Sequence, residues 1–562
     1  MTGPRRHPGV EIRYRGRPIA CAPGDSVAAA LIAAGEHVFR ETRFGDRRGV
    51  FCGMGVCHEC MVAIDGVPSQ RACMTPVRAG MTVEPGVPSP VLDGEAPPRL
   101  REEGLAPDVL VIGAGPAGLA AAAAAAEAGA EVVLADERPK LGGQYFKQPS
   151  EGLELPELDP QYLQGLALIE RVRGAGVTIL QAVQVWAAFA PDELRAIGPE
   201  KVYALRPRRL VLATGAYERG VPMPGWTLPG YLTTGAAQTL LRSYGVVPGR
   251  RVLVSGNGPL NVQVAAELVR AGATVVALAE LARPASPRHA VALARMAAAA
   301  PRLIATGLGY TRTLAAAKVP LLYGSAIVRA EGGETVERAT VMRIDRAGRP
   351  VAGTERELEV DAVCAGFGFL PSNEIARALG CRHAFDPKRG HLVAVVDETG
   401  RSSVEGVWVV GDGGGVAGAR VAQATGFLAG LAAAGGSGSL EQEAAAVRRE
   451  RRRAERFQRA LSRLYAAPRL LDQLADPATL VCRCESVPLS AVEEAYSSGI
   501  RESGAVKRVS RAGMGSCQGR YCGAVLAELG ATRRGGVPEE LGGFAPAPPF
   551  KPLPLGSIGR ED

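Results

Sequence analysis

Short apolar strands alternate with Ala-rich helical stretches along much of the chain. The apolar run Val109–Ile112 leads into a glycine turn and the Ala-rich stretch 118–130, and a second apolar run ends at Asp136. Continuous apolar runs of this length are typical of buried parallel strands, and the intervening stretch has the composition of a buried helix. The order predicts a βαβ unit. A similar order returns at 250–280, so we expect a second fold of this kind inserted into the first.

The N-terminal segment shows alternation of polar and apolar residues instead. The stretches "VEIRYRGRPIAC" (10–21) and "MVAIDGVPSQRAC" (61–73) each predict a hairpin, and the second turns at Asp65-Gly66. Between them, "SVAAALIAAG" (26–35) predicts a short helix capped by Asp25-Ser26. Two hairpins around one helix predict a β-grasp domain.

Linker composition divides the rest of the chain. A Pro/Glu-rich connector covers 84–104, and a Gly/Ser hinge covers 432–442. We therefore predict a β-grasp domain at 8–95, an α/β two-dinucleotide-binding domain of Rossmann-like type at 105–440 with an inserted nucleotide fold at about 240–350, a helical linker at 441–475, a small helical domain at 476–530 and a tail at 531–562.

Charge and targeting signals narrow the class of protein. A net charge of +8 would suit nucleic acid, but no basic run is interleaved with stacking aromatics, so we expect no nucleic-acid partner. The N-terminus lacks the apolar core of a signal peptide, which predicts a cytoplasmic protein. The basic helix expected at 443–465 has a thin apolar face, so we expect a solvated linker helix with at most peripheral membrane contact.

Eight of the eleven cysteines fall into two clusters, and each cluster predicts a metal site in a reducing cytoplasm. The first follows the spacing of plant-type ferredoxins, C-x4-C-x2-C and then a distant fourth cysteine. Its ligands would be Cys52, Cys57, Cys60 and Cys73. Gly53 and Gly55 allow the tight loop that turns backbone amides toward sulfur. Four thiolates could also bind zinc, but the four-residue gap and the glycines favour a [2Fe-2S] cluster.

The second cluster lies near the end of the chain, with C-x-C, 32 intervening residues and then C-x4-C. Its ligands would be Cys482, Cys484, Cys517 and Cys522. The loop "GMGSCQGRYCG" (513–523) carries glycines of the kind that a cluster loop needs. Spacing alone leaves zinc and iron open for this site.

The glycine turn after Val109–Ile112 matches G-x-G-x-x-G, which brings the backbone close to a pyrophosphate and aims a helix N-terminus at it. Two further strands, ending near 213–215 and 410–412, complete the expected nucleotide site. The predicted cofactor-binding residues are Gly113, Ala114, Gly115, Pro116, Ala117, Gly118, Asp136, Glu137, Gly142, Gly143, Gln144, Thr214, Gly215, Gly411 and Asp412. The inserted fold has Gly256-x-Gly258-x-x-Asn261 instead, and the missing third glycine leaves open a nicotinamide nucleotide site or a structural relic.

Expected catalytic groups are absent from the sequence pattern. Disulfide reductases carry C-x-x-C or C-x4-C beside the flavin, and nothing between 105 and 440 supplies such a pair. No Ser-His-Asp or paired-carboxylate arrangement stands out either. We therefore predict no catalytic side chain, and a chain equipped to move electrons.

Three stretches carry a family resemblance. "ATGAYERGVPMPGWTLPGYLTTGAAQTLL" (213–241), "DERPKLGGQ" (136–144) and "SGNGPLN" (255–261) resemble the α subunits of heteromeric dye-linked amino-acid and opine dehydrogenases, of the hydrogen cyanide synthase, opine oxidase and proline/hydroxyproline dehydrogenase type. The stretch 479–523 resembles [2Fe-2S] domains of the bacterioferritin-associated ferredoxin type. The resemblance covers roughly residues 10–530 and implies a glutathione-reductase-like flavoprotein fold.

The resemblance also implies a function. It implies an FAD-dependent oxidoreductase subunit for CH-NH donors, with FAD at the first nucleotide site (NAD or ATP there in some members), two [2Fe-2S] clusters, and FMN between subunits in some members. A partner β subunit resembling D-amino-acid oxidase would oxidise the amino acid or opine, and electrons would reach a quinone or another acceptor. The alternatives are a stand-alone NAD(P)H-dependent acceptor reductase and a zinc-stabilised nucleotide-binding scaffold.

Overall fold

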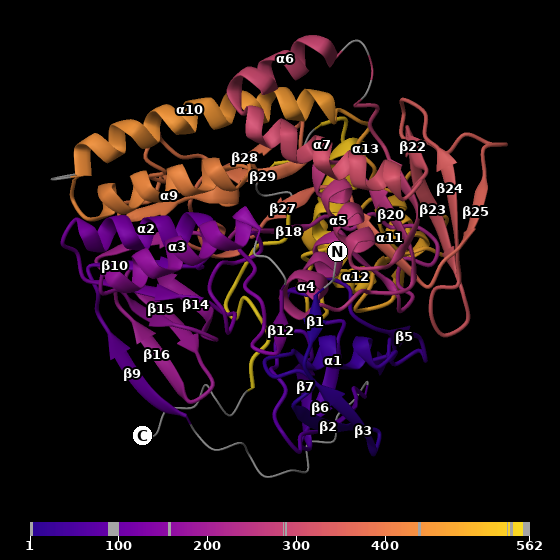
Figure 1. Cartoon of the computed structure of the whole chain (residues 1–562), viewed down its shortest axis with the longest axis horizontal. Coiled ribbons are helices and arrows are strands. Elements are labelled where there is room, and N and C mark those ends of the chain that lie inside the picture. Colours follow the sequence, from indigo (N-terminus) through magenta and orange to yellow (C-terminus); the bar gives the residue numbers. More distant parts are fainter. Residues whose placement is uncertain are drawn as a thin grey trace.

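A computed structural model of the 562-residue chain describes residues 4–87, 100–155, 159–284, 286, 289–436, 440–536, 538–539 and 543–554. Parts of the predicted connector at 84–104, the hinge at 432–442 and the tail at 531–562 lie outside the described residues. Figure 1 shows the indigo N-terminal domain below the inserted nucleotide fold, with a yellow C-terminal stretch running down between this domain and the first nucleotide fold.

The N-terminal domain has the predicted β-grasp layout. Its mixed sheet has the order β3-β2-β8-β6-β7, formed by β2 (Val10–Tyr14), β3 (Arg17–Cys21), β6 (Met61–Ile64), β7 (Val67–Arg71) and β8 (Thr82–Pro85), beside α1 (Val27–Ala33) and the short pair β4 (Arg40–Glu41) and β5 (Arg47–Arg48). The Ser26 side chain accepts the Ala29 amide, as expected of the cap. Asp65 and Gly66 both have positive φ, as a two-residue type I′ hairpin turn requires.

The first nucleotide fold is a five-stranded parallel sheet with the order β13-β11-β10-β17-β30. It consists of β10 (Val109–Ile112), β11 (Val132–Ala135), β13 (Thr178–Leu180), β17 (Arg209–Leu212) and β30 (Val407–Val409), with the helices α2 (Pro116–Glu127), α3 (Pro160–Gly174) and α9 (Ala419–Ala433). A four-stranded sheet follows the order β14-β15-β16-β9, formed by β9 (Arg101–Leu105), β14 (Gln184–Ala190), β15 (Glu193–Ile197) and β16 (Lys201–Leu205). The predicted βαβ unit is confirmed.

Small residues let α2 and α9 approach closely, which accounts for the Ala- and Gly-rich composition of this region. A Cβ at Gly426 would lie 2.0 Å from the Ala117 carbonyl oxygen, and one at Gly430 would lie 2.2 Å from that of Ala121. No larger side chain fits between the two backbones. This contact fixes α2, whose N-terminus opens on the first nucleotide site.

The inserted fold repeats the architecture with the order β19-β26-β20-β21-β22. It consists of β19 (Tyr231–Thr233), β20 (Arg251–Gly256), β21 (Thr274–Glu280), β22 (Leu321–Tyr323) and β26 (Ala362–Gly366), with α4 (Thr234–Tyr244), α5 (Pro259–Arg270), α6 (Ala290–Ala299), α7 (Pro301–Ala316) and the antiparallel strands β23 (Ser325–Glu331), β24 (Arg338–Arg343) and β25 (Arg356–Glu359). The fold is longer than the predicted span of about 240–350, because β26, a central strand, returns after the antiparallel excursion.

Shorter elements connect the nucleotide folds to the C-terminal domain. They are β1 (Arg5–Arg6), β12 (Leu153–Glu154), β18 (Ala216–Glu218), β27 (Phe369–Pro371), α8 (Glu374–Ala378), β28 (His383–Asp386), β29 (His391–Ala394) and the 3-10 helix η2 (Gly411–Gly414). The C-terminal domain contains β31 (Leu480–Cys482), β32 (Val487–Pro488), α11 (Leu489–Ser497), α12 (Ser503–Ser510) and α13 (Cys522–Arg533).

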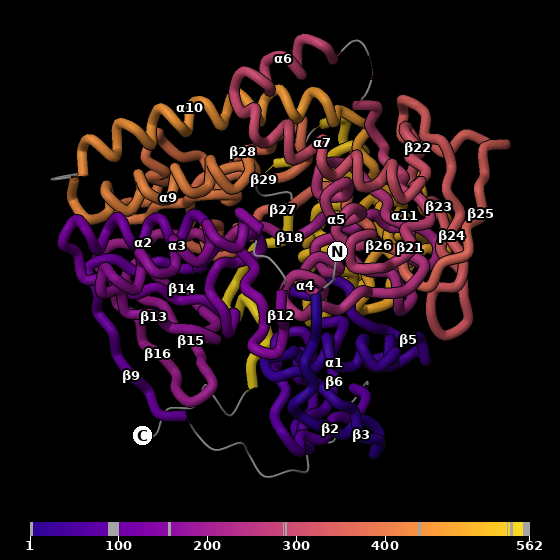
Figure 2. The backbone as a smooth tube through the Cα atoms, viewed as in Figure 1, coloured from indigo at the N-terminus to yellow at the C-terminus, as the bar shows by residue number. Residues whose placement is uncertain are grey.

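The linker helix α10 (Glu441–Leu464) ends before the predicted limit at 475. Its apolar stripe is buried, with Phe457 and Leu464 packed in a cluster with residues of α6, and it lies along α9 in Figure 2. The thin apolar face that the sequence predicts for this helix is thus covered from Phe457 onward. Within the described residues no single helix is long and apolar enough to span a bilayer; α6 and α7 meet that test as a pair, with a bend of 120° between them.

Candidate functional site

A cavity of about 1520 Å³ lies between the two nucleotide folds and also borders the β-grasp domain. Most of the predicted cofactor-binding residues line it, and these are Gly113, Gly115, Pro116, Ala117, Asp136, Glu137, Gly143, Gln144, Thr214, Gly215, Gly411 and Asp412. The loops after β10, β11, β17 and β30 bring them together at the carboxyl ends of the parallel strands, where open α/β sheets bind ligands. The cavity is large enough for a dinucleotide.

The remaining predicted residues, Ala114, Gly118 and Gly142, shape the loop from behind. A Cβ at Gly118 would lie 1.7 Å from the Gly113 carbonyl oxygen, so α2 can start this close to β10 with glycine alone. The Gly142 amide donates to the Ala114 carbonyl at 2.9 Å. These contacts hold the glycine turn open toward the cavity.

The acidic pair after β11 has two distinct roles. The Asp136 carboxylate accepts the Ala114 amide at 2.5 Å and the Arg138 amide at 2.8 Å. Burial raises the pKa of Asp136, and these two amides oppose that rise. Since a carboxylate has about four acceptor sites, Asp136 can still accept a ribose hydroxyl. Glu137 instead forms an ion pair with Lys551.

Lys551 belongs to the C-terminal segment, for which the sequence predicts only a tail. Phe550 is buried, and its amide donates to the Trp186 carbonyl at 2.8 Å. Arg520 donates to the Phe550 carbonyl, also at 2.8 Å. Phe550 and Lys551 both line the cavity, so the end of the chain forms part of the nucleotide site. No local pattern in the sequence signals this long-range contact.

The loop after β30 places Asp412 at the cavity, on η2, just before the N-terminus of α9. Burial raises the pKa of Asp412 to about 6. Gly411 has a φ of +63°, in the left-handed region that glycine adopts without strain. A polar cofactor group could donate a hydrogen bond to this half-buried carboxyl.

A buried acid–base pair at the same cavity was not among the predicted residues. Glu218 accepts the Gly235 amide at 2.7 Å, and Lys147 donates to the Gln238 side chain at 3.0 Å. Burial raises the pKa of Glu218 to about 7 and lowers that of Lys147 to about 7. Both groups can therefore take or give a proton near neutral pH beside a bound cofactor. The one sequence signal is a charged residue just after a buried strand, in "ATGAYER".

The four thiols of the first cluster are all buried. The amides of Met54 and Cys57 point at Cys52 Sγ, at 3.5 and 3.4 Å. Burial alone would raise the pKa of Cys52, but hydrogen bonds from the Cys57 thiol and from backbone amides lower it to about 6. Gly53 and Gly55 both have positive φ, as predicted. Amides directed at sulfur in a buried glycine loop fit an iron–sulfur cluster.

The second group of thiols also fits a metal centre. The Cys482 and Cys484 sulfurs are 3.8 Å apart, and those of Cys484 and Cys517 are 3.6 Å apart. Two thiolates on one tetrahedral metal with bonds of about 2.3 Å lie about 3.8 Å apart. Hydrogen bonds from the thiols of Cys484 and Cys522 lower the pKa of Cys482 to about 3, aided by the Gly513 amide. Within the described residues no three metal-ligating side chains converge on one point, as a mononuclear zinc site would require. A two-iron cluster does not require this, because each iron binds only two of the four thiolates. All eight cysteines stay the predicted ligands.

The inserted fold explains its missing third glycine. The Asn261 side chain accepts the Thr234 hydroxyl at 2.8 Å and donates to the Gly366 carbonyl at 2.9 Å. The Asn261 side chain therefore links α5 to β26 and to α4 at the position of the third glycine of the motif. Glu280 accepts the Gly258 amide at 3.0 Å and lines the cavity.

Comparisons with known proteins agree with this organisation. Residues 107–426 match the pyridine nucleotide-disulphide oxidoreductase family, residues 8–86 a 2Fe-2S iron-sulfur cluster binding domain, and residues 480–529 a BFD-like [2Fe-2S] binding domain. The predicted two-dinucleotide fold with a [2Fe-2S] domain at either end is thereby confirmed.

Similar proteins extend over most of the chain. An opine oxidase subunit of Agrobacterium tumefaciens (strain Ach5) is 32% identical over 81% of this chain and 91% of its own length. Hydrogen cyanide synthase subunit HcnB of Pseudomonas protegens is 30% identical over 81% of this chain and 97% of its own length. The crystal structure of L-proline dehydrogenase from P. horikoshii shares the fold, with a TM-score of 0.71 at 22% identity over 98% of this chain and 97% of that one.

Proposed function

Since this chain belongs to the family that contains these opine oxidase and hydrogen cyanide synthase subunits, we propose that it is the electron-transfer subunit of a heteromeric amino-acid or opine dehydrogenase. A partner resembling D-amino-acid oxidase oxidises the C–N bond. This chain passes the electrons to a quinone or another acceptor, and it works in the cytoplasm, with at most peripheral contact to the membrane.

One observation carries the proposal. Cys52, Met54 and Val56 of the predicted cluster loop line the same cavity as Gly115 and Asp412 of the flavin site. An electron carrier bound in the nucleotide cavity therefore borders a predicted ligand of the first cluster.

The residues that line the cavity and the two groups of cysteines support a specific set of cofactors. The first nucleotide site suits FAD, or NAD or ATP as in some relatives by resemblance, and the two cysteine groups suit [2Fe-2S] clusters. FMN at the contact with the partner belongs to the same proposal. FAD accepts two electrons and each cluster accepts one, so this set converts a two-electron oxidation into single-electron steps. Asp136 and Asp412 hold the nucleotide, while Glu218 and Lys147 hold protons at the cavity.

The nearby cysteines support a route through clusters and not through a redox disulfide. Within the described residues, Cys364 lies in β26 and Cys381 is buried in a different apolar cluster. Burial raises the pKa of Cys364 well above its ordinary value, which suppresses the reactive thiolate. Neither cysteine lines the cavity.

The test separates this chain from its partner. The tagged chain is isolated from its native cells with whatever subunits co-purify, and separately after expression alone. We expect amine- or opine-dependent dye reduction from the complex, none from the chain alone, and iron–sulfur spectra from both. Substrate-dependent dye reduction by the isolated chain would refute the division of labour, and a zinc content without an iron–sulfur spectrum would favour the scaffold alternative.

A second candidate is a stand-alone NAD(P)H-dependent acceptor reductase. The observation in its favour is that the cavity continues past the α5 N-terminus at Pro259 to Glu280, the acidic residue at the end of β21. An acid at this position can bind a ribose hydroxyl. This alternative predicts that NADH bleaches the flavin of the isolated chain under anaerobic conditions.

A further inference from the structure

The two predicted iron–sulfur sites lie against each other through one aromatic contact. Phe51 precedes Cys52, and Tyr521 precedes Cys522. Their rings meet edge to face, with centroids 5.0 Å apart. Both side chains are almost fully buried and belong to the same apolar cluster as Cys57 and Cys517. No solvent-filled gap separates the first site from the second at this point.

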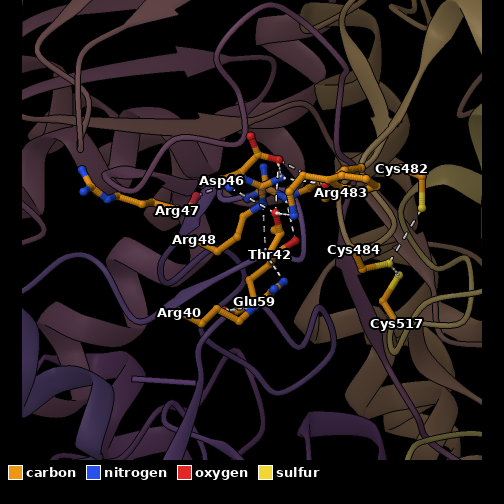
Figure 3. A network of polar contacts seen from close by, with 12 residues as sticks. Arg40, Thr42, Asp46, Arg47, Arg48, Glu59, Cys482, Arg483, Cys484 and Cys517 are labelled. Atoms are coloured by element: carbon orange, nitrogen blue, oxygen red, sulfur yellow. Dashed lines mark hydrogen bonds and ion pairs between the residues drawn. The ribbon is translucent and has the colours of Figure 1, made fainter. Parts of the chain in front are cut away.

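Arg483 joins the two sites through a second contact. It stands between Cys482 and Cys484, and its side chain crosses from the C-terminal domain to the β-grasp domain, as Figure 3 shows. Its guanidinium carbon lies 3.9 Å from the centroid of the Phe51 ring, and its Nε lies 3.2 Å from a carboxylate oxygen of Glu59. Stacking and ion pairing together suit arginine and not lysine.

Glu59 is the matching group on the other domain. It precedes Cys60, and its side chain is 1% exposed. Arg40 donates to it at 3.0 Å, and Arg48 lies 3.7 Å away. Three guanidinium groups, those of Arg40, Arg48 and Arg483, therefore surround this buried carboxylate. The side chain is held in place from both domains.

All four residues of this contact are chain neighbours of predicted cluster ligands; they are Phe51, Glu59, Arg483 and Tyr521. The geometry of the contact therefore sets the separation of the two clusters. Cys52 and Cys57 of the first site and Cys517 of the second lie in the same buried cluster as the Phe51 and Tyr521 rings.

We propose that Arg483 is the positioning residue that holds the two iron–sulfur sites as one electron-exchanging pair, with Phe51 and Tyr521 packed between them. This rests on the proposed function, since it assumes that both sites hold [2Fe-2S] clusters. In the exchange one electron leaves the reduced cluster, which is oxidised, and enters the oxidised cluster, which is reduced; no bond breaks and no proton moves.

Electron paramagnetic resonance of the full chain tests the proposal without any turnover. Each reduced [2Fe-2S] cluster carries one unpaired electron, and two such spins at close range broaden or split each other's signal. In dithionite-reduced wild type we expect two spins per chain with mutual splitting. In Cys517→Ser, with the second cluster lost, the signal of the first cluster should become unsplit.

Variants then test Arg483 itself. Arg483→Gln should keep two spins per chain but lose most of the splitting, and Arg483→Lys should restore part of it, because the ion pair returns without the planar stack. Arg511→Gln is the matched control: Arg511 pairs at 3.0 Å with Glu485, next to Cys484, and the change leaves in place the contact of Glu485 with Arg43 of the β-grasp domain at 3.9 Å. It removes the same charge from the second site and should leave the splitting unchanged.

Each outcome bears on a different claim. Two normal, non-interacting signals in the wild type would overturn the inference and leave the proposed function standing. If the Arg483→Gln variant kept the full wild-type splitting of its resonance signals, the proposed positioning role of Arg483 would be refuted. Absence of iron–sulfur signals in iron-replete wild-type protein would overturn the proposed function as well.

Discussion

Two glycines of the same turn, Gly115 and Gly118, should respond in opposite ways to replacement by alanine. A Cβ at Gly118 would lie 1.7 Å from the Gly113 carbonyl oxygen, whereas one at Gly115 meets no atom within 4 Å. A carbon and a carbonyl oxygen normally stay about 3.3 Å apart. Gly118→Ala therefore forces α2 away from β10 by more than 1 Å, while Gly115→Ala leaves the fold undisturbed.

The magnitudes follow from these contacts. Forced overpacking of a buried contact costs about 3 kcal/mol at the upper end of its usual range, which is a fall in Tm of roughly 6–12 °C for a domain of about 200 residues. Gly115→Ala should keep the Tm of the flavin-free protein. Its new methyl group points into the cavity where a pyrophosphate must approach the backbone, so we expect FAD affinity to fall about tenfold, or 1.4 kcal/mol.

The assay is thermal unfolding of flavin-free protein, combined with FAD titration followed by fluorescence. The reasoning is refuted if Gly118→Ala unfolds at the wild-type temperature. It is equally refuted if Gly115→Ala destabilises the flavin-free protein, or binds FAD as tightly as the wild type.

Three further changes probe the inserted fold and the C-terminal segment. Asn261→Ala, which leaves the Gly366 carbonyl without its side-chain donor, should lower the unfolding free energy by about 1–3 kcal/mol, and an unchanged urea midpoint would contradict the linking role. Burial raises the pKa of Glu280 to about 8, from about 4.5 in the unfolded chain. Because the folded state holds this proton more tightly, the carboxyl stabilises the fold fully below about pH 4.5. This contribution is lost as the pH rises through 8. Between pH 5.5 and 7.5 wild type should therefore lose about 2 kcal/mol more than Glu280→Gln, and parallel urea midpoints would disprove this. Phe550→Ala should speed FAD release and lower the unfolding free energy by about 3 kcal/mol or more; wild-type release rates would exclude a role of the chain end in the site.

Local sequence pattern is sufficient for the elements of the nucleotide site. The glycine spacing after Val109–Ile112 predicts the turn, because each glycine is required by backbone atoms only a few residues away that leave no room for a side chain. The same holds for the hairpin at Asp65-Gly66 and for the spacing of the cysteines. These are features in which the cause and the effect lie close together along the chain.

Features made by distant partners escape the sequence pattern. Asn261 stands where the glycine motif of the inserted fold would have its third glycine. Its hydrogen-bond partner Gly366 lies more than a hundred residues away along the chain. The ion pair of Lys551 with Glu137 joins residues that are separated by most of the chain. No sequence pattern around either residue predicts the pairing. In the sequence Arg483 is only the residue between two cysteines, and its role depends on the ion pair with Glu59 in another domain. Packing of this kind is set by the tertiary fold, which single-sequence periodicity does not report.

The central claim is that electrons from amine oxidation enter this chain and reach its iron–sulfur clusters. The direct measurement adds an amino acid or opine substrate to the anaerobic native complex, freezes it, and records its electron paramagnetic resonance spectrum. The account predicts reduced [2Fe-2S] signals that need both substrate and partner. Bleached flavin with both clusters still oxidised, in a complex whose clusters dithionite does reduce, would contradict it.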